Sequence, residues 1–259
     1  MEEYNMFKAE CVGWISEQSK DVELIKSSKD FFNRSFRFKY SYNFEHLGRP
    51  IIQYPQDIVA IQELIWRIKP DLVIETGIAH GGSLVLSASM LAIIDLCEAI
   101  EAGVSIDPSK SKRKVLGIDI DIRSHNKLAI ESHPMASRIE MIQGSSIESG
   151  VIEHVRKIAA SYNKIMVLLD SNHTHDHVLA ELHAYAPLVS IGSYCVVFDT
   201  FVEDVPDDTF PDRPWGPGNN PKTAVHEFMK NNNIFQIDRF MDSRLLISVA
   251  PDGYLKRIF

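Results

Sequence analysis

This chain has few cysteines, and it has fewer basic than acidic residues. The three cysteines, Cys11, Cys97 and Cys195, are odd in number and widely separated, which argues against a disulfide framework or a CxxC zinc ribbon. There are 27 lysines and arginines against 35 aspartates and glutamates, for a formal net charge of −8. Nucleic acids and anionic membranes favour clustered positive charge. The composition therefore argues against both as general partners.

Targeting and membrane signals are also missing. The first ten residues are too polar and acidic for a secretory signal, and no apolar run reaches about 18 residues. We therefore expect a cytoplasmic protein without a transmembrane segment. The length of 259 residues, 45% of them hydrophobic, suits one α/β domain over residues 55–259. A helical, aromatic-rich extension over residues 1–54 is expected to precede it.

Part of that extension, Ser27–Ser41, mixes aromatic with basic residues. Such a mixture can stack on nucleic-acid bases, but it more often packs its aromatic rings on a core while its cations stay in water. We favour packing on the core. The segment before Tyr40 could also cover a site or form a subunit contact, so the sequence leaves a homo-oligomer open.

Short apolar segments alternate with amphipathic ones along the rest of the chain. Strands are predicted at 71–75, 115–120, 138–143, 165–169 and 194–198, and helices at 56–68, 83–101 and 177–186. Strands that alternate with helices indicate an α/β fold with a doubly wound, mostly parallel sheet flanked by helices.

The first predicted strand leads into a glycine-containing turn, in the sequence DLVIETGIAHGGS at 71–83. Gly77 and Gly81 let the backbone approach a ligand closely where a helix begins. The spacing departs from the GxGxxG pattern of dinucleotide folds, and no convincing TyrXXXLys pair is present, which disfavours a nicotinamide enzyme. The alternative is a tight strand-to-helix turn with no ligand.

Polar residues follow the predicted strands, and in a doubly wound sheet the ligand lies beyond these strand ends. Asp119, after the second strand, can accept both hydroxyls of a ribose, while Ser145 and Ser146, after the third, can address a purine edge. Helix capping is the alternative for all three residues. The residues predicted to bind a nucleoside-type cofactor are Glu75, Thr76, Gly77, Gly81, Ser83, Asp119, Ser145, Ser146 and Asp170.

Three histidines and two aspartates crowd the segment LLDSNHTHDHV at 168–178. Asp170 and Asp199 each follow a predicted strand and could supply hard oxygen ligands to Mg²⁺. His173, near that metal, could accept a hydroxyl proton as a neutral imidazole. For His175 and His177 we expect capping or solvation of the next helix. A two-histidine, one-carboxylate iron(II) oxygenase site is the competing interpretation.

The loop at 203–221 is rich in proline, glycine and aspartate and contains Trp215. Long loops without secondary structure are uncommon unless they act, so we interpret this one as a substrate lid. A passive surface loop is the alternative.

Together these motifs resemble the cephalosporin hydroxylase (CmcI-like) family, which includes rhamnosyl O-methyltransferases. The stretches IETGIAHGGS, GIDI, LLDSNHTHDHV, GSYCVVFDT and NPKTAVHEF carry the resemblance, which spans roughly Tyr40 to the C-terminus. It implies a Rossmann-like class I methyltransferase fold and an S-adenosylmethionine-dependent O-methyltransferase, often with Mg²⁺. The acceptor would be a small hydroxylated molecule, such as a sugar on a glycolipid, polysaccharide or secondary metabolite.

The resemblance also implies roles for single residues. Glu75, Gly77 and Ser83 match the S-adenosylmethionine turn, and Asp119 matches the ribose-binding acid. The metal ligands would be Asp170 and Asp199 and the general base His173. Relatives often carry two adjacent acids where this chain has Phe198 and Asp199. This departure leaves three alternatives: weaker metal binding, a site completed by Thr200 or Glu203, or no bound metal. A non-catalytic S-adenosylmethionine-binding protein would lack the Asp170, His173 and Asp199 set.

Overall fold

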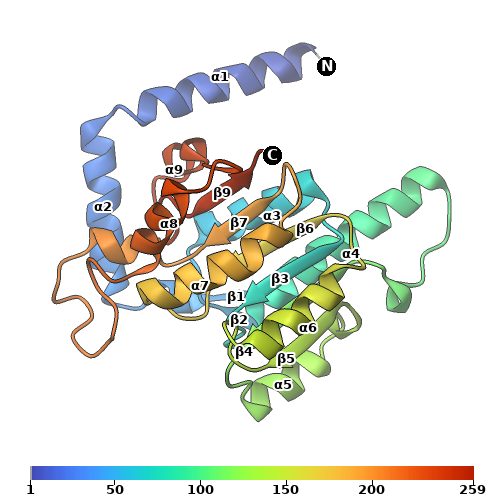
Figure 1. Cartoon of the computed structure of the whole chain (residues 1–259). Helices are drawn as coiled ribbons and strands as arrows, with labels where there is room; N and C mark the ends of the chain where they lie inside the picture. The colour runs from blue at the N-terminus through green and yellow to red at the C-terminus, as the bar shows by residue number, and fades with distance from the viewer. Residues whose placement is uncertain (1) are drawn as a thin grey trace.

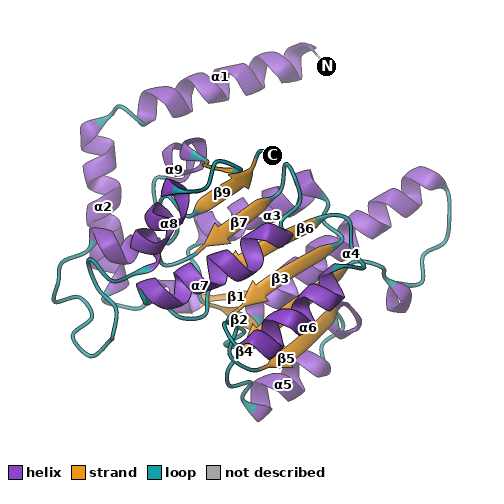
Figure 2. Cartoon of the chain, viewed as in Figure 1, coloured by secondary structure: helices purple, strands orange, loops and turns teal. Residues whose placement is uncertain are grey.

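Seven strands form the central sheet of the computed structural model, which describes residues 2–259 (Figures 1 and 2). Their spatial order is β5-β4-β3-β6-β7-β9-β8. The first five are parallel, whereas β9 runs antiparallel to both β7 and β8. The prediction of a doubly wound, mostly parallel sheet is confirmed. The strands are β3 Leu72–Thr76, β4 Lys114–Asp119, β5 Ile139–Gln143, β6 Ile165–Leu169, β7 Tyr194–Val197, β8 Phe235–Ile237 and β9 Tyr254–Arg257.

The chain reverses its direction of progress across the sheet at β3. From β3 it moves outward through β4 to β5, and it then returns to place β6 on the other side of β3. Thr76 at the end of β3 pairs in register with Ile118 of β4 and Leu169 of β6. The carboxyl ends of these strands are therefore level, and a crevice for a ligand is expected beyond such a reversal.

Helices cover both faces of the sheet (Figure 2). Val73 points into the core beneath one group of helices, whereas Leu72 and Ile74 point into the core beneath the other. Because both faces are covered, the strands are apolar on both sides. The first group is α3 Pro55–Ile68, α4 Gly82–Ala102 and α5 Ser124–Glu131, and the second is α6 Ser149–Ala159, α7 His175–Tyr185 and α8 Pro221–Lys230.

Helix α4 is long and apolar enough to cross a membrane by length and composition alone, with a mean hydropathy of 1.8 over its best window. Half of that window is buried inside the protein. Leu84, Leu91 and Ile94 are fully buried against the sheet core. The apolar composition of α4 is thus that of a core helix.

The N-terminal segment forms α1 Glu2–Gln18 and α2 Val22–Phe36. Helix α1 has no buried residue and extends across the top of Figure 1, above α9 Arg239–Leu245. In α2, Phe32 packs against Tyr54 and Phe201, with both pairs of ring centroids 4.8 Å apart. Phe32, Phe36 and Tyr40 pack on the core as predicted. Phe31 and Phe38 are instead exposed, at 44% and 70%.

Several short elements connect the larger ones. A hairpin of β1 Phe44–His46 and β2 Arg49–Ile51 packs against α4. The short 3₁₀ helices are Tyr40–Asn43, Pro108–Lys110, Ala136–Arg138, Ala186–Leu188 and Thr200–Asp204.

Gly77 follows β3 with a φ of +89°, and an added Cβ would lie 2.0 Å from the carbonyl oxygen of Asp170. This glycine thus lets two protein segments meet at the crevice. We expect Gly77→Ala to destabilise the fold by about 2 kcal/mol or more, because both the positive φ and the close backbone contact oppose a side chain. Chemical denaturation measures this loss.

Gly150→Ala is the matched control, since Gly150 lies in α6 with open space around it. It should be neutral or stabilise the protein by up to about 1 kcal/mol. Equal stability of the two variants would contradict a special requirement for glycine at position 77.

Candidate active site

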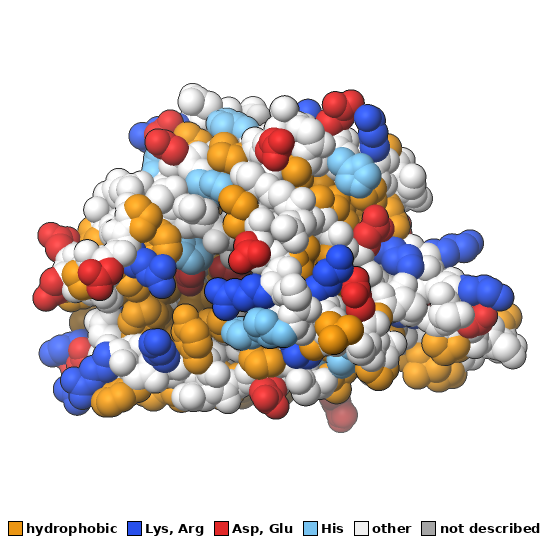
Figure 3. Space-filling view, turned by 90° about the horizontal axis from the view of Figure 1, so that it is seen from below, with side chains coloured by type: hydrophobic (Ala, Val, Ile, Leu, Met, Phe, Trp, Pro, Cys, Tyr) orange, Lys and Arg blue, Asp and Glu red, His pale blue; other side chains and the backbone are white. Residues whose placement is uncertain are grey.

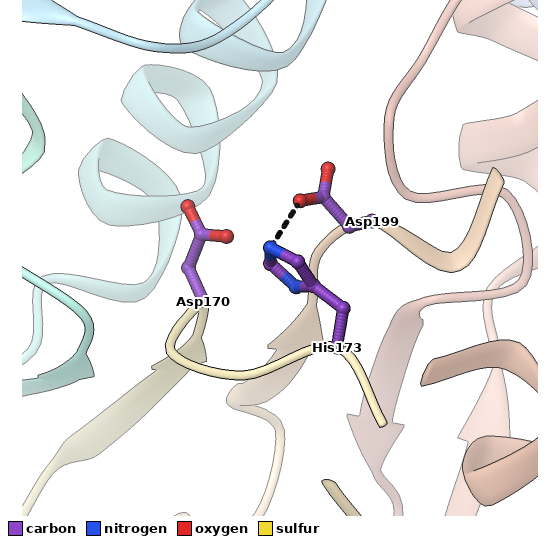
Figure 4. Close-up of side chains that lie close together, drawn as sticks. All are labelled: Asp170, His173 and Asp199. Atoms are coloured by element: carbon purple, nitrogen blue, oxygen red, sulfur yellow. Dashed lines mark ion pairs between the residues drawn. The ribbon is translucent and has the colours of Figure 1, made fainter. Parts of the chain in front are cut away.

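Asp170, His173 and Asp199 lie together at the carboxyl ends of β6 and β7 (Figure 4). One ligand atom of each lies within 4.8 Å of the others, and His173 Nε2 is 3.0 Å from Asp199 Oδ2. Asp170 directly follows β6, whereas Asp199 precedes the 3₁₀ helix Thr200–Asp204 in a left-handed conformation, with a φ of 56°. The structure brings together the two predicted metal ligands and the predicted base.

Burial and neighbouring carboxylates shift the pKa values of Asp170 and His173 in this cluster. Burial raises the pKa of Asp170 well above its usual range, and Asp199 and Glu75 raise it further. Burial opposes the charged form of His173, but the Asp199 carboxylate outweighs this effect and raises the pKa of the imidazole. Two carboxylates on one side of a crevice fit Mg²⁺, which takes one or two protein carboxylates and keeps several waters.

Thr200 and Glu203 do not complete the cluster as predicted. The Thr200 side chain is fully buried, and its hydroxyl donates a hydrogen bond of 2.6 Å to the Pro251 carbonyl. Glu203 accepts a hydrogen bond of 2.7 Å from the Gly218 backbone N–H. Both side chains thus have partners elsewhere in the protein, and the third group of the cluster is His173.

The other two histidines of the segment point elsewhere. His175 Nδ1 lies 2.8 Å from the Thr223 hydroxyl of α8, and His177 Nε2 lies 3.0 Å from the Ser146 hydroxyl. The metal-type cluster found among residues 2–259 thus contains one imidazole. A site with two histidines and one carboxylate is not formed, which disfavours the iron oxygenase interpretation.

Glu75 and Ser83 face one another across the start of the crevice. The Ser83 hydroxyl donates a hydrogen bond to Glu75 Oε1, and burial raises the pKa of Glu75 to about 8. Beside them, Gln53 donates a hydrogen bond of 3.1 Å from Nε2 to Asp170 Oδ2. Gln53 is not among the predicted site residues. The one sequence signal for it is a polar residue after the apolar pair Ile51 and Ile52, in the loop before α3.

Asp119 and Thr76 already have backbone partners. Asp119 Oδ2 accepts hydrogen bonds from the N–H groups of Ile78 and Ala79, at 2.8 and 3.3 Å. The predicted ribose-binding acid therefore also holds the turn that follows β3. Thr76 is fully buried, and its hydroxyl accepts from the Asp170 N–H at 3.3 Å. Thr76 thus joins β3 to the end of β6.

Helix capping was the alternative role for Ser145 and Ser146, but neither serine caps the next helix. The residue that precedes α6 is Glu148, and its side chain makes no capping hydrogen bond. Ser146 is buried and its hydroxyl faces His177, while the Ser145 carbonyl accepts from the Glu148 N–H at 3.0 Å.

Gly81, with a φ of +82°, is the residue that precedes α4.

Trp215 brings the loop at 203–221 over the cluster. Its ring meets the His173 ring edge to face, with centroids 4.8 Å apart, and the Arg213 guanidinium lies 5.1 Å from the Trp215 centroid. Seen from below, the surface is hollowed, with acidic side chains in the floor and hydrophobic and basic ones around the rim (Figure 3).

Comparison with known proteins identifies the family. The family model for rhamnosyl O-methyltransferase/CmcI matches residues 38–258. The chain belongs to the rhamnosyl O-methyltransferase/CmcI family. A rhamnosyl O-methyltransferase of Mycobacterium tuberculosis is 30% identical over 206 residues, which are 78% of this chain and 73% of that protein. The one from Mycobacterium leprae is 28% identical over 214 residues, which are 82% of each chain.

Solved structures of CmcI share the fold of this family member. An apo structure of CmcI has a TM-score of 0.55 at 16% identity, and the match covers 84% of this chain and 77% of that one. A structure of CmcI with Mg and SAM has a TM-score of 0.54 at 16% identity and covers 84% and 78%. The family resemblance predicted from the sequence is confirmed, and the chain shares the fold of these CmcI structures.

Proposed function

We propose that this member of the rhamnosyl O-methyltransferase/CmcI family transfers the methyl group of S-adenosylmethionine to a hydroxyl of a sugar-containing acceptor. The observation that carries the proposal is the cluster of Asp170, His173 and Asp199, which lies under Trp215 and beside the turn after β3. Relatives named rhamnosyl O-methyltransferase support a sugar as the acceptor.

Asp170 and Asp199 would hold the divalent cation. We propose Mg²⁺, because their carboxylates are hard oxygen ligands. When bound, the cation would lower the pKa of an acceptor hydroxyl. The chain itself holds the two carboxylates just beyond the ends of β6 and β7. His173 Nε2 donates its hydrogen to Asp199 Oδ2 at 3.0 Å, so Nδ1 is the nitrogen that would accept the hydroxyl proton. The Trp215 ring offers an apolar face on which a sugar ring can rest.

The cofactor is assigned to the crevice between the turn after β3 and the ends of β4 and β5. Its methionyl part would meet Glu75, Ser83 and Asp170. Its ribose would meet Asp119, whose Oδ1 also accepts a hydrogen bond of 3.0 Å from the Asp121 N–H. Ser145 lies beyond β5, on the side proposed for the purine. We also propose that the enzyme is cytoplasmic. Measurement of its mass in solution would decide whether it forms a homo-oligomer.

The function is tested by calorimetric titration with S-adenosylmethionine and S-adenosylhomocysteine, with and without Mg²⁺. Methyl transfer to a panel of rhamnosides and other glycosides is then followed by mass spectrometry. We expect cofactor binding, weaker binding by Asp119→Ala, and transfer that stops when Mg²⁺ is chelated. Absence of cofactor binding by the wild type would refute the methyltransferase proposal.

Trp215→Ala should raise the KM for the acceptor about tenfold, since an aromatic ring packed on a ligand contributes about 1 kcal/mol or more. The Kd for S-adenosylmethionine should stay unchanged, because Trp215 contacts His173 rather than the proposed cofactor crevice. Trp66→Ala is the control, as Trp66 is 45% exposed on α3. An equal loss of cofactor and acceptor binding would contradict a lid role for Trp215.

A further inference from the structure

A small cavity of about 20 Å³ lies between α3, α4 and the ends of β3 and β6. A space of this size holds about one water-sized group. Apolar side chains such as Leu168 and Phe198 line part of it, and Gln53, Glu75 and Ser83 form a polar part of its wall. The cavity borders Asp170, so it adjoins the proposed methyl-transfer site.

Three polar atoms of the residues around this cavity have no hydrogen-bond partner within residues 2–259. They are Gln53 Oε1, Glu75 Oε2 and Ser87 Oγ. The side chains are nearly inaccessible, with exposed fractions of 6% for Gln53, 2% for Glu75 and 0% for Ser87. Buried polar atoms almost always have a partner, so these three unpaired atoms indicate that the cavity receives a hydrogen-bonding group.

The chemistry of the wall defines that ligand. An amide oxygen can only accept hydrogen bonds, the Ser87 hydroxyl can also accept one, and the acidic side chains of Glu75, Asp57 and Asp170 line the cavity together, whereas no lysine or arginine does. The group that fits is therefore small, rich in N–H donors and positively charged. A protonated primary amine has these properties.

The position of Gln53 is fixed from two sides. Its Nε2 is committed to Asp170 at 3.1 Å, which leaves Oε1 as the free end of the same amide group. The loop that carries it follows β2, and β2 lies so close to α4 that a Cβ on Gly82 would be 2.2 Å from the Pro50 carbonyl oxygen. Gln53 is therefore held beside the start of α4 and the proposed cofactor turn.

We propose that Gln53 binds the α-ammonium group of the cofactor through Oε1, together with Glu75, while its Nε2 positions Asp170. The inference rests on the proposed function, which supplies a cofactor with a methionyl ammonium group. Gln53 is thus a positioning residue that links the cofactor crevice to the metal site.

The test is a comparison of two ligands on matched variants. Calorimetry gives the Kd of S-adenosylhomocysteine and of an analogue that lacks the amino group, for the wild type, Gln53→Met and Gln53→Glu. Gln53→Met keeps the length of the side chain but removes its hydrogen bonds, whereas Gln53→Glu keeps the acceptor. Gln56→Met is the control, because Gln56 also has a buried, unpaired amide oxygen but does not line the cavity.

We expect Gln53→Met to weaken S-adenosylhomocysteine binding about 10- to 100-fold, as for a lost hydrogen bond to a charged group, and to leave binding of the analogue unchanged. Gln53→Glu should keep the preference for the amino group, and Gln56→Met should match the wild type. Equal weakening of both ligands by Gln53→Met, or weakening of neither, would overturn the proposal. If only Gln53→Glu folds, loss of its preference for the amino group would overturn it. If the wild type binds neither ligand, the proposed function itself fails.

Discussion

Asp170→Asn should lower kcat/KM for methyl transfer on the order of 10³-fold, because it removes one of two carboxylates proposed to hold the cation that activates the acceptor. The amide that replaces it carries no charge and is a poor ligand for Mg²⁺. Raising the Mg²⁺ concentration should recover part of the activity, since Asp199 remains. The measurement is kcat/KM as a function of Mg²⁺ concentration.

Stability should move in the opposite direction from activity. Burial and the nearby Asp199 and Glu75 raise the pKa of Asp170, so the charged carboxylate is unfavourable in the folded state. Asp170→Asn removes that charge, and we expect its Tm to equal or exceed the wild-type value. A loss of activity with an intact Tm separates a functional role from a folding defect.

The matched control is Asp176→Asn, which changes an exposed aspartate in the first turn of α7. It should leave kcat/KM within about twofold of the wild type, because surface charges contribute little. If Asp170→Asn kept activity within tenfold at every Mg²⁺ concentration, the proposed metal site would be wrong.

The sheet could be predicted because its strands are covered on both faces. Leu72, Val73 and Ile74 form an uninterrupted apolar run, and the structure buries all three. Such runs followed by polar residues located the ends of β3, β6 and β7 within one or two residues. The predicted convergence of Asp170 and Asp199 then followed from the parallel arrangement alone.

Shorter or more polar elements could not be found in this way. Strand β8 has three residues, and β9 ends in the polar pair Lys256 and Arg257. Neither segment therefore shows the alternation of apolar and polar residues that identifies a strand. Helix α5 has eight residues and buries Asn126 and Ile130, which leaves little amphipathic signal. These elements depend on contacts with distant parts of the chain.

The directions of the three histidines also depend on the fold. Helix α7 begins at His175, so His173 remains in the loop that faces the crevice. His175 and His177 are two residues apart on a helix, which directs them to different sides. Spacing in the sequence therefore placed all three near the site, whereas the start of the helix decided which one entered it.

His173→Gln should lower kcat about 10²- to 10⁴-fold, the range for loss of a general base. Glutamine keeps a polar group near Asp199 but cannot accept a proton at neutral pH. The Kd for S-adenosylhomocysteine should change little, because His173 contacts Asp199 and Trp215 rather than the proposed cofactor residues. His175→Gln is the control, since His175 faces Thr223 and Glu227.

The dependence on pH distinguishes a base from a structural contact. Only the neutral imidazole accepts a proton, so wild-type kcat should rise with pH as His173 loses its proton, and His173→Gln should lack this rise.

The contribution of His173 to the stability of the fold changes with pH in the opposite direction. Although burial alone would lower the pKa of His173, Asp199 raises it on balance; the ion pair therefore stabilises the fold at acidic pH, and this contribution is lost as pH rises through the folded-state pKa. A fall of activity in acid without a fall of Tm would follow from protonation of His173, whereas an unchanged pH profile in His173→Gln would exclude it as the base.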